Sequence, residues 1–178
     1  MVANKSRSSG AQKDAIALLK ADHRQVEGLF KEFEKASSAR KGELAKTICQ
    51  ALRIHTSIEE EIFYPAFLQQ AGDEDIHHEA EVEHAGAKHL IDQIESADPG
   101  DDYFDAKVSV LSEMIKHHVR EEEKPGGMLA EARKAKMDLA ALGAQLATRK
   151  AELEAESERG WSHVPRNKAL DSTVLITT

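Results

Sequence analysis

One pair of residue types that can bind metal ions occurs twice in this sequence at the same spacing. His55 is followed by Glu59, and His118 is followed by Glu122, so each histidine precedes a glutamate by four positions. Residues four apart lie one turn apart on the same helix face, and both side chains can therefore reach the same ion or two adjacent ions. Two such helices facing each other would supply two imidazoles and two bridging carboxylates.

These pairs interrupt stripes of apolar residues at helical spacing. Leu52 and Ile62 flank the first pair at 3- and 4-residue steps, and Ile115 precedes the second. Two further histidines, His23 and His84, interrupt the apolar stripes of two other segments. All six residues are therefore expected to face the core, where an unpaired carboxylate costs several kcal/mol or must take up a proton.

Four imidazoles and two carboxylates without a thiolate suit iron, manganese or zinc, and bridging carboxylates favour a dinuclear iron or manganese centre. The alternative is that each pair is an isolated buried ion pair. That alternative needs two independent ion pairs and leaves the other two histidines unexplained. We therefore predict a metal site of six residues: His23, His55, Glu59, His84, His118 and Glu122.

A rival to the second pair lies one residue away, where His117 is followed by Glu121. The stripe that leads to His118 and Glu122 is the more apolar of the two, so we favour that pair and keep the other as an alternative.

Other side chains near the predicted ligands are expected to have other roles. His77 lies about 10 Å from His84 along the helix axis, too far to share its metal, and is expected at the mouth of the site or on the surface. His89 is expected to be exposed, and the acidic cluster 79–83 to lie on a solvated face. Tyr64 could approach the site as a hydrogen-bond donor.

The elements that must position these residues are helices. Glycine (10) and proline (4) are scarce among the 178 residues, and no run of alternating β-branched or aromatic residues is long enough for a sheet. The all-α class follows, with four helices of about 20 residues in an up-down-up-down bundle over 14–124. They are expected from residue 14, from about 43 past Pro65, over 75–96 and over 103–124, with connections at 37–42, 69–75 and 96–102.

The flanking segments are assigned separately. Residues 1–13 are predicted to be a flexible N-terminus. After the interruption KPGG (124–127), an Ala-rich additional C-terminal helix is expected over 128–157, packed along the bundle, against a protein partner or against a second copy. No structure is predicted for the tail, 158–178.

Charge and composition exclude several classes of function. The net charge is −8, and the Lys and Arg residues are interspersed with Asp and Glu, which argues against a nucleic-acid partner. No segment approaches the ~20 apolar residues of a membrane span. A single cysteine, Cys49, and a polar start without an apolar signal segment favour a reducing, cytoplasmic location.

Four segments carry a resemblance to a known family. KADHRQVEGLF (20–30), IHTSIEEEIFYPA (54–66), EVEHAGAKHLIDQI (81–94) and HHVREEE (117–123) resemble the hemerythrin family, specifically the bacterial hemerythrin-like HHE cation-binding domains. The resemblance covers about 14–124. It implies a four-helix bundle around two iron ions with an oxo or hydroxo bridge. The four predicted histidines would be terminal ligands, and Glu59 and Glu122 would bridge the ions.

The sequence departs from this family at two places. Lys88 stands where oxygen-carrying hemerythrins have a second histidine on the third helix, and KPGGML (124–129) stands where an aromatic-proline pair like that of 63–65 is expected. Four histidines rather than five leave one more coordination position for a ligand or water.

The resemblance implies binding of dioxygen, for transport or sensing. Two alternatives stay open: peroxide or nitric oxide detoxification or iron-centre repair at the same site, and an iron reservoir or structural bundle. Carrier, sensor and enzyme are all compatible with this set of ligands, and the small ligand would be dioxygen, peroxide or nitric oxide.

Overall fold

The computed structural model describes residues 14–160, so the predicted flexible N-terminus and most of the predicted tail lie outside the described residues. Within that range every regular element is a helix, which confirms the all-α class, and none of these helices is long and apolar enough to cross a membrane. The elements are α1 (Ala15–Lys35), α2 (Ser38–Ile58), the π-helix η1 (Glu59–Phe63), α3 (Tyr64–Gln70), α4 (Glu74–Glu95), α5 (Phe104–Glu123), α6 (Met128–Lys134) and α7 (Leu139–Glu158).

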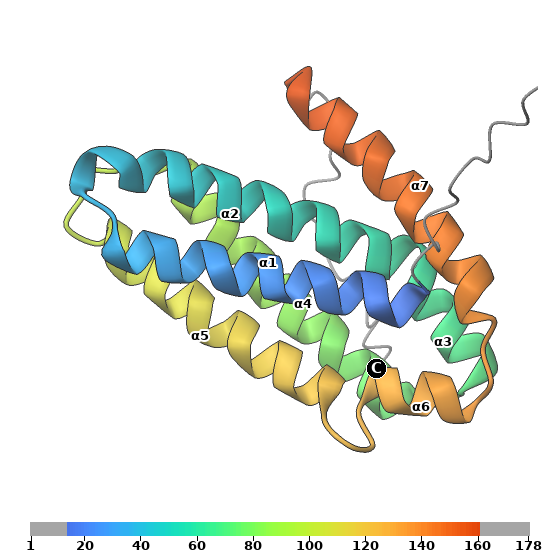
Figure 1. The fold of residues 1–178 in the computed structure, drawn as a ribbon. Coiled ribbons are helices and arrows are strands. Elements are labelled where there is room, and N and C mark those ends of the chain that lie inside the picture. The colour runs from blue at the N-terminus through green and yellow to red at the C-terminus, as the bar shows by residue number, and fades with distance from the viewer. Residues whose placement is uncertain (1–13, 161–178) are drawn as a thin grey trace, which may run out of the picture.

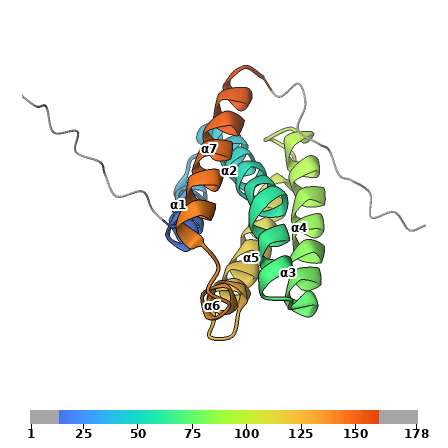
Figure 2. The ribbon, with the colours of Figure 1, turned by 90° about the vertical axis from the view of Figure 1, so that its right-hand side faces the viewer.

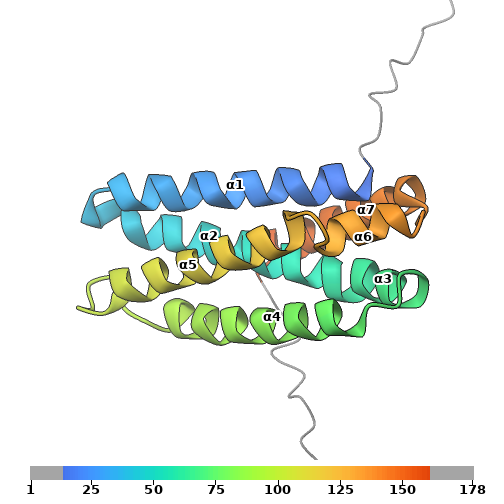
Figure 3. The same cartoon turned by 90° about the horizontal axis from the view of Figure 1, so that it is seen from below.

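Four helical rods run antiparallel to their neighbours in sequence (Figures 1 and 3). They are α1, the continuous run of α2, η1 and α3, and then α4 and α5. The predicted up-down-up-down bundle is confirmed. After α5 the chain turns at the end of the bundle through α6, and α7 then packs over α1 and α2 (Figure 2).

The first connection is shorter than predicted. Only Ala36 and Ser37 separate α1 from α2, so the assignment of 38–42 to a loop was wrong. Gly42, which suggested a break, lies inside α2, where an added Cβ would lie 2.9 Å from Cγ of Pro99 in the turn before α5. This glycine therefore permits a close approach between two segments rather than ending a helix.

The additional C-terminal helix is divided in two, which corrects the prediction of one helix over 128–157. Lys136 adopts a positive φ of 58°, and Met137 turns into the core. Asp138 then caps α7 by accepting a hydrogen bond from the backbone N–H of Ala141. The one signal in the sequence was this aspartate before an apolar stripe, because neither glycine nor proline marks the break.

The second rod changes its helical winding just before Pro65. A proline inside an α-helix removes one backbone hydrogen bond and clashes with the preceding turn. The chain accommodates Pro65 with the π-helical stretch η1, in which the N–H of Tyr64 bonds to the carbonyl of Glu59, five residues back. Such π-helical turns are frequent at functional sites, and this one carries a predicted metal ligand.

The core consists of two apolar clusters with the ionisable residues between them. One cluster, which includes Ile16, Phe67 and Leu146, fills the end near α3, α6 and α7, and the other, which includes Phe30 and Leu111, fills the opposite half. On the first three rods the predicted ligands fall between residues of the two clusters, and on α5 His118 and Glu122 flank Val119, the last residue of the second cluster on that rod. The bundle therefore buries a polar layer in its interior.

Gly127, which precedes α6, leads to a first testable prediction. A Cβ at this position would collide with the carbonyl oxygen of Glu121 and lie 2.7 Å from that of Glu122. Gly127→Ala is therefore expected to destabilise the protein by roughly 1–3 kcal/mol, measured by urea unfolding. Gly28→Ala is the control, because nothing lies within 4 Å of an added Cβ inside α1, and it should stabilise the protein by roughly 0.5–1 kcal/mol. Equal stability of the Gly127→Ala variant and the wild type would contradict the prediction.

Candidate metal centre

The six predicted ligands lie together in the middle of the bundle. Each is at most 5% exposed, and Glu59 is completely buried. α1 supplies His23, α4 supplies His84, and the other four come from the two His-x-x-x-Glu pairs on α2–η1 and α5. Donor atoms of His23, His55 and Glu59, and likewise of Glu59, His84 and His118, lie within 4.8 Å of one another.

The four imidazoles form two pairs. The Nε2 atoms of His23 and His55 are 3.1 Å apart, and those of His84 and His118 are also 3.1 Å apart. Each pair joins two neighbouring rods of the bundle, and the four Nε2 atoms point inward. The arrangement presents two separate two-nitrogen sites.

Each carboxylate reaches both pairs of imidazoles. Glu59 Oε2 lies 3.2 Å from Nε2 of His55 and 3.4 Å from Nε2 of His84. Glu122 places Oε2 3.4 Å from Nε2 of His23 and Oε1 3.6 Å from Nε2 of His118. Two carboxylates that each span two two-nitrogen sites have the arrangement expected of bridging ligands between two cations.

The outer nitrogen of every imidazole faces another carboxylate. The Nδ1–oxygen distances are 2.8 Å for His23 to Glu123, 3.7 Å for His55 to Asp22, 2.9 Å for His84 to Glu60 and 2.7 Å for His118 to Glu83. At His23, His84 and His118, where the carboxylate is within hydrogen-bond distance, it favours the proton on Nδ1 and the lone pair on Nε2, as in metal-binding histidines. The two Nε2 atoms of each pair lie within hydrogen-bond distance of each other, and a metal ion bound by both would replace that contact.

These supporting carboxylates follow a rule around the bundle. Each stands next to one predicted ligand in the sequence and supports a different ligand on the next rod. Asp22 of α1 faces His55, Glu60 of η1 faces His84, Glu83 of α4 faces His118, and Glu123 of α5 faces His23. The cycle therefore closes from α5 back to α1. The assignment of the whole cluster 79–83 to a solvated face was wrong at Glu83.

Three of the four oxygens of the inner carboxylates lack a hydrogen-bond partner within the described residues. Neither oxygen of Glu59 nor Oε2 of Glu122 makes a hydrogen bond, although all three atoms are buried. Burial, followed by the charge of Glu122, raises the pKa of Glu59 well above its ordinary value. Burial lowers the pKa of His55 to about 4 and lowers that of His84 as well. The imidazoles of His55 and His84 thus favour the neutral form that binds metals, and cations would supply the partners that Glu59 lacks.

The pKa values of His118 and Glu122 shift in the directions opposite to those of the histidines and the glutamate just described. Burial opposes both charges, and it is outweighed by the attraction between the two groups together with Glu83 beside His118 and with His23 and His55 beside Glu122. The pKa of His118 is raised, chiefly by Glu122, and that of Glu122 is lowered to about 2, chiefly by His118. This end of the site therefore keeps its carboxylate ionised and available to a cation.

Tyr64 reaches the centre from α3. Its hydroxyl oxygen lies 3.1 Å from Nε2 of His84 and 3.3 Å from Oε1 of Glu122, to which it donates. Burial raises the pKa of this phenol well above its ordinary value, so the hydroxyl keeps its proton. The sequence suggested this approach only as a possibility, because the π-helical turn that directs α3 leaves no pattern in the residue order.

The other histidines within residues 14–160 lie outside the cluster. His117 has a half-exposed side chain and pairs with Glu83, which places the rival pair of His117 and Glu121 away from the centre. His89 is exposed, as expected. His77 is buried with its ring edge-on to Tyr64, which corrects the expectation of a mouth or surface position.

Lys88 contacts a supporting carboxylate rather than the centre. Its Nζ donates to Oε1 of Glu60 at 2.6 Å, and the same oxygen lies 2.9 Å from Nδ1 of His84. A positive charge thus holds the carboxylate that orients this histidine.

A small chamber of about 10 Å³ lies beside the imidazoles. Its walls are the four histidines together with Asp22, Thr56 and the apolar side chains of Val26, Leu52, Ile115 and Val119. This volume is close to that of a single water-sized probe. The chamber therefore has room for about one water-sized molecule and excludes anything much larger.

Comparison with known proteins agrees with this geometry. The model of the hemerythrin HHE cation binding domain matches residues 14–125. A protein named DNA nickase from Nostoc sp. strain PCC 7120 is 31% identical over 107 residues, which are 60% of this chain and 30% of that protein. The chain thus spans less than a third of that relative.

One solved structure is similar in fold. It is a hemerythrin HHE cation binding domain-containing protein from Mycobacterium kansasii, with a TM-score of 0.71 and 21% sequence identity. The alignment covers 83% of this chain and 91% of the other, so the shared fold extends beyond residues 14–125.

Proposed function

The chain belongs to the hemerythrin HHE cation binding domain family, and on this premise we propose that it holds two iron ions and binds a small diatomic ligand, dioxygen in the first place. The proposed ligands are the four inner histidines, with Glu59 and Glu122 as bridges. Six protein ligands do not fill the coordination of two iron ions, which leaves positions for a small molecule. When bound, the iron pair would supply these positions together with reversible electron transfer.

The observation that carries this proposal is the chamber at the imidazoles. Apart from the ligands, it is lined mainly by aliphatic side chains, and its volume is about 10 Å³. An apolar chamber of this size suits a neutral diatomic molecule such as dioxygen or nitric oxide. It does not suit the accumulation of many ions, so an iron reservoir is the weaker alternative.

A specific contact favours peroxide chemistry as a second candidate. Tyr64 places a proton-bearing hydroxyl between His84 and Glu122. A peroxidic substrate needs a proton when its O–O bond breaks, and this hydroxyl is a buried group that could supply it. The net reaction would convert two molecules of hydrogen peroxide into two of water and one of dioxygen.

DNA cleavage is not a further candidate. The match to the Nostoc relative covers 30% of that protein. The net charge of this chain is −8, whereas binding to phosphates requires clustered positive charge. The prediction of no nucleic-acid partner is therefore retained.

The proposal is tested by metal analysis and absorption spectroscopy after expression with added iron. We expect about two irons per chain and the near-ultraviolet absorption of a bridged iron pair. The reduced protein should bind dioxygen or nitric oxide, and steady release of dioxygen from added hydrogen peroxide would favour the second candidate. Less than one iron per chain would overturn both.

Val119 offers a test of the chamber itself. Val119→Ile adds a methyl group at the chamber wall and is expected to weaken nitric oxide binding to the reduced protein by roughly tenfold or more, without changing the iron content. Val108→Ile is the matched control, because Val108 is buried in the same helix but does not line the chamber. Equal weakening by both variants would show that the chamber is not where the ligand binds.

A further inference from the structure

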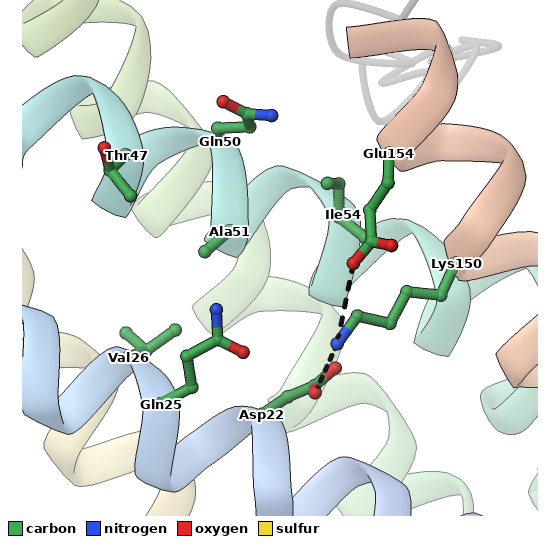
Figure 4. Close-up of a pocket in the computed structure, with 9 residues that line it drawn as sticks. All are labelled: Asp22, Gln25, Val26, Thr47, Gln50, Ala51, Ile54, Lys150 and Glu154. Atoms are coloured by element: carbon green, nitrogen blue, oxygen red, sulfur yellow. Dashed lines mark hydrogen bonds and ion pairs between the residues drawn. The ribbon is translucent and has the colours of Figure 1, made fainter. Parts of the chain in front are cut away.

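Helix α7 lies outside the segment matched by the family model, yet it reaches the candidate metal centre. It packs over α1 and α2, and Lys150 extends from it toward α1 (Figure 4). The Nζ atom of Lys150 lies 2.5 Å from Oδ1 of Asp22. The other oxygen of Asp22 faces Nδ1 of the proposed ligand His55 at 3.7 Å. One buried carboxylate thus connects α7 to a proposed ligand.

All four supporting carboxylates are paired with a cation or a second histidine. Glu123 pairs with Lys20 and Arg24, Glu60 with Lys88, Glu83 with His117, and Asp22 with Lys150. The first three have partners within residues 14–125. Asp22 has instead a partner beyond α6, and its side chain is 10% exposed. Without Lys150, this buried carboxylate would lack its cation.

His55 is the proposed ligand with the weakest support. Its Nδ1 is buried and makes no hydrogen bond within the described residues, because the distance to Asp22 exceeds hydrogen-bond length. The other three histidines have carboxylate oxygens within 2.9 Å of Nδ1. The orientation of the His55 ring therefore depends on where Asp22 is held.

A cavity on the outer side of Asp22 provides space for a different orientation of this carboxylate. The cavity has a volume of about 160 Å³ and lies between α1, α2 and α7, with Gln25 and Gln50 on its walls (Figure 4). It shares Asp22 and Val26 with the small chamber at the imidazoles. If the ion pair were lost, Asp22 could turn toward water in this cavity and away from His55.

We propose that Lys150 is a positioning residue of the metal centre: it holds Asp22 against His55 and thereby makes the pair of His23 and His55 dependent on α7. This inference rests on the proposed function, in which His55 is an iron ligand. It assigns a role at the centre to a helix outside the family segment.

Lys150 can be tested without removing α7 from the bundle. Leu146 and Leu153 of α7 are buried, and Arg149 pairs with Glu61 at 2.7 Å. These contacts should keep α7 in place in the Lys150→Met variant. Unchanged resistance of α7 to limited proteolysis in the metal-free variant would verify this.

The experiment measures the rate at which the iron-loaded full chain loses iron to a ferrous-ion chelator under reducing conditions. Lys150→Met is expected to lose about half of its iron roughly tenfold faster than the wild type, as for other groups that orient metal ligands. Its near-ultraviolet absorption should change, and Lys150→Arg should restore both properties. Lys134→Met is the control, because Lys134 forms an exposed ion pair with Glu131.

A double variant separates positioning from a general loosening of the helix. Asp22→Asn should act like Lys150→Met, and the two changes together should have no larger effect than either alone, because they break the same connection. Additive effects, or wild-type iron loss in Lys150→Met, would overturn the inference while the proposed function stands. A wild-type chain that holds no iron would overturn both.

Discussion

Removal of the metal is expected to lower the melting temperature by on the order of 20 °C. A ligand that binds only the folded state stabilises it by about 4 kcal/mol at a thousandfold excess over its dissociation constant, so the two proposed iron ions would together contribute about 8 kcal/mol. Each kcal/mol corresponds to roughly 2–4 °C for a chain of this size. The effect should exceed that of most single substitutions.

The physical reason for so large an effect is the buried polar layer between the two apolar clusters. In the metal-free protein, Glu59 has no hydrogen-bond partner, and each pair of imidazoles brings two Nε2 atoms within 3.1 Å. Removal of the ions exposes none of these groups to water. The metal-free fold therefore retains the cost of burying them without the ions that compensate for it.

Thermal unfolding followed by circular dichroism would measure this difference. The iron-loaded protein is compared with protein stripped by a chelator and with stripped protein to which iron has been restored. Recovery of the higher midpoint on restoring iron is the control for damage during stripping. Equal midpoints in all three samples would show that the layer is stable without metal and that the binding energy is small.

The sequence was sufficient to predict the rods and the inward-facing ionisable residues. The reason is that both depend on one regular spacing, the 3- and 4-residue steps of a helix. His118 was favoured over His117 by the stripe that leads to it, and the exposures of the two side chains agree with that choice. Predictions from spacing succeed where a helix is regular.

The sequence was not sufficient where the backbone departs from that spacing or where a contact joins distant segments. The π-helical turn before Pro65 and the positive φ of Lys136 are local departures whose backbone conformation the nearby Pro65 and Asp138 did not specify. The contact between Lys150 and Asp22 joins residues 128 positions apart. One usable signal was present: every supporting carboxylate is adjacent in sequence to a predicted ligand.

Glu59→Gln is expected to change the stability of the metal-free and iron-loaded proteins in opposite directions. In the metal-free protein, Glu59 brings a carboxylate oxygen within 3.4 Å of Nε2 of both His55 and His84. An amide of the same shape can instead donate to one of these nitrogens and carries no charge to desolvate. The metal-free variant should therefore be more stable than the metal-free wild type by roughly 1–3 kcal/mol.

The same substitution should abolish the binding of the two proposed iron ions. A neutral amide is a poor bridge between two cations. The variant therefore keeps only one of the two proposed bridging carboxylates, that of Glu122. We expect at least a roughly 100-fold loss of iron affinity, which is the upper end of the effect of removing a supporting group. As purified, the variant should hold less than one iron per chain, and chelators should barely change its melting temperature.

Glu121→Gln is the matched control, because it makes the same chemical change next to Glu122 but outside the centre, where Glu121 pairs with Lys124. The Glu121→Gln variant should bind iron as the wild type does, and its metal-free form should be no more stable than the metal-free wild type. The two measurements on Glu59→Gln distinguish a metal site from a buried ion pair. If Glu59 served only to stabilise the fold through His55, its replacement would destabilise the metal-free protein. If its role is to bind a cation, the buried carboxylate destabilises the fold as long as no cation is bound.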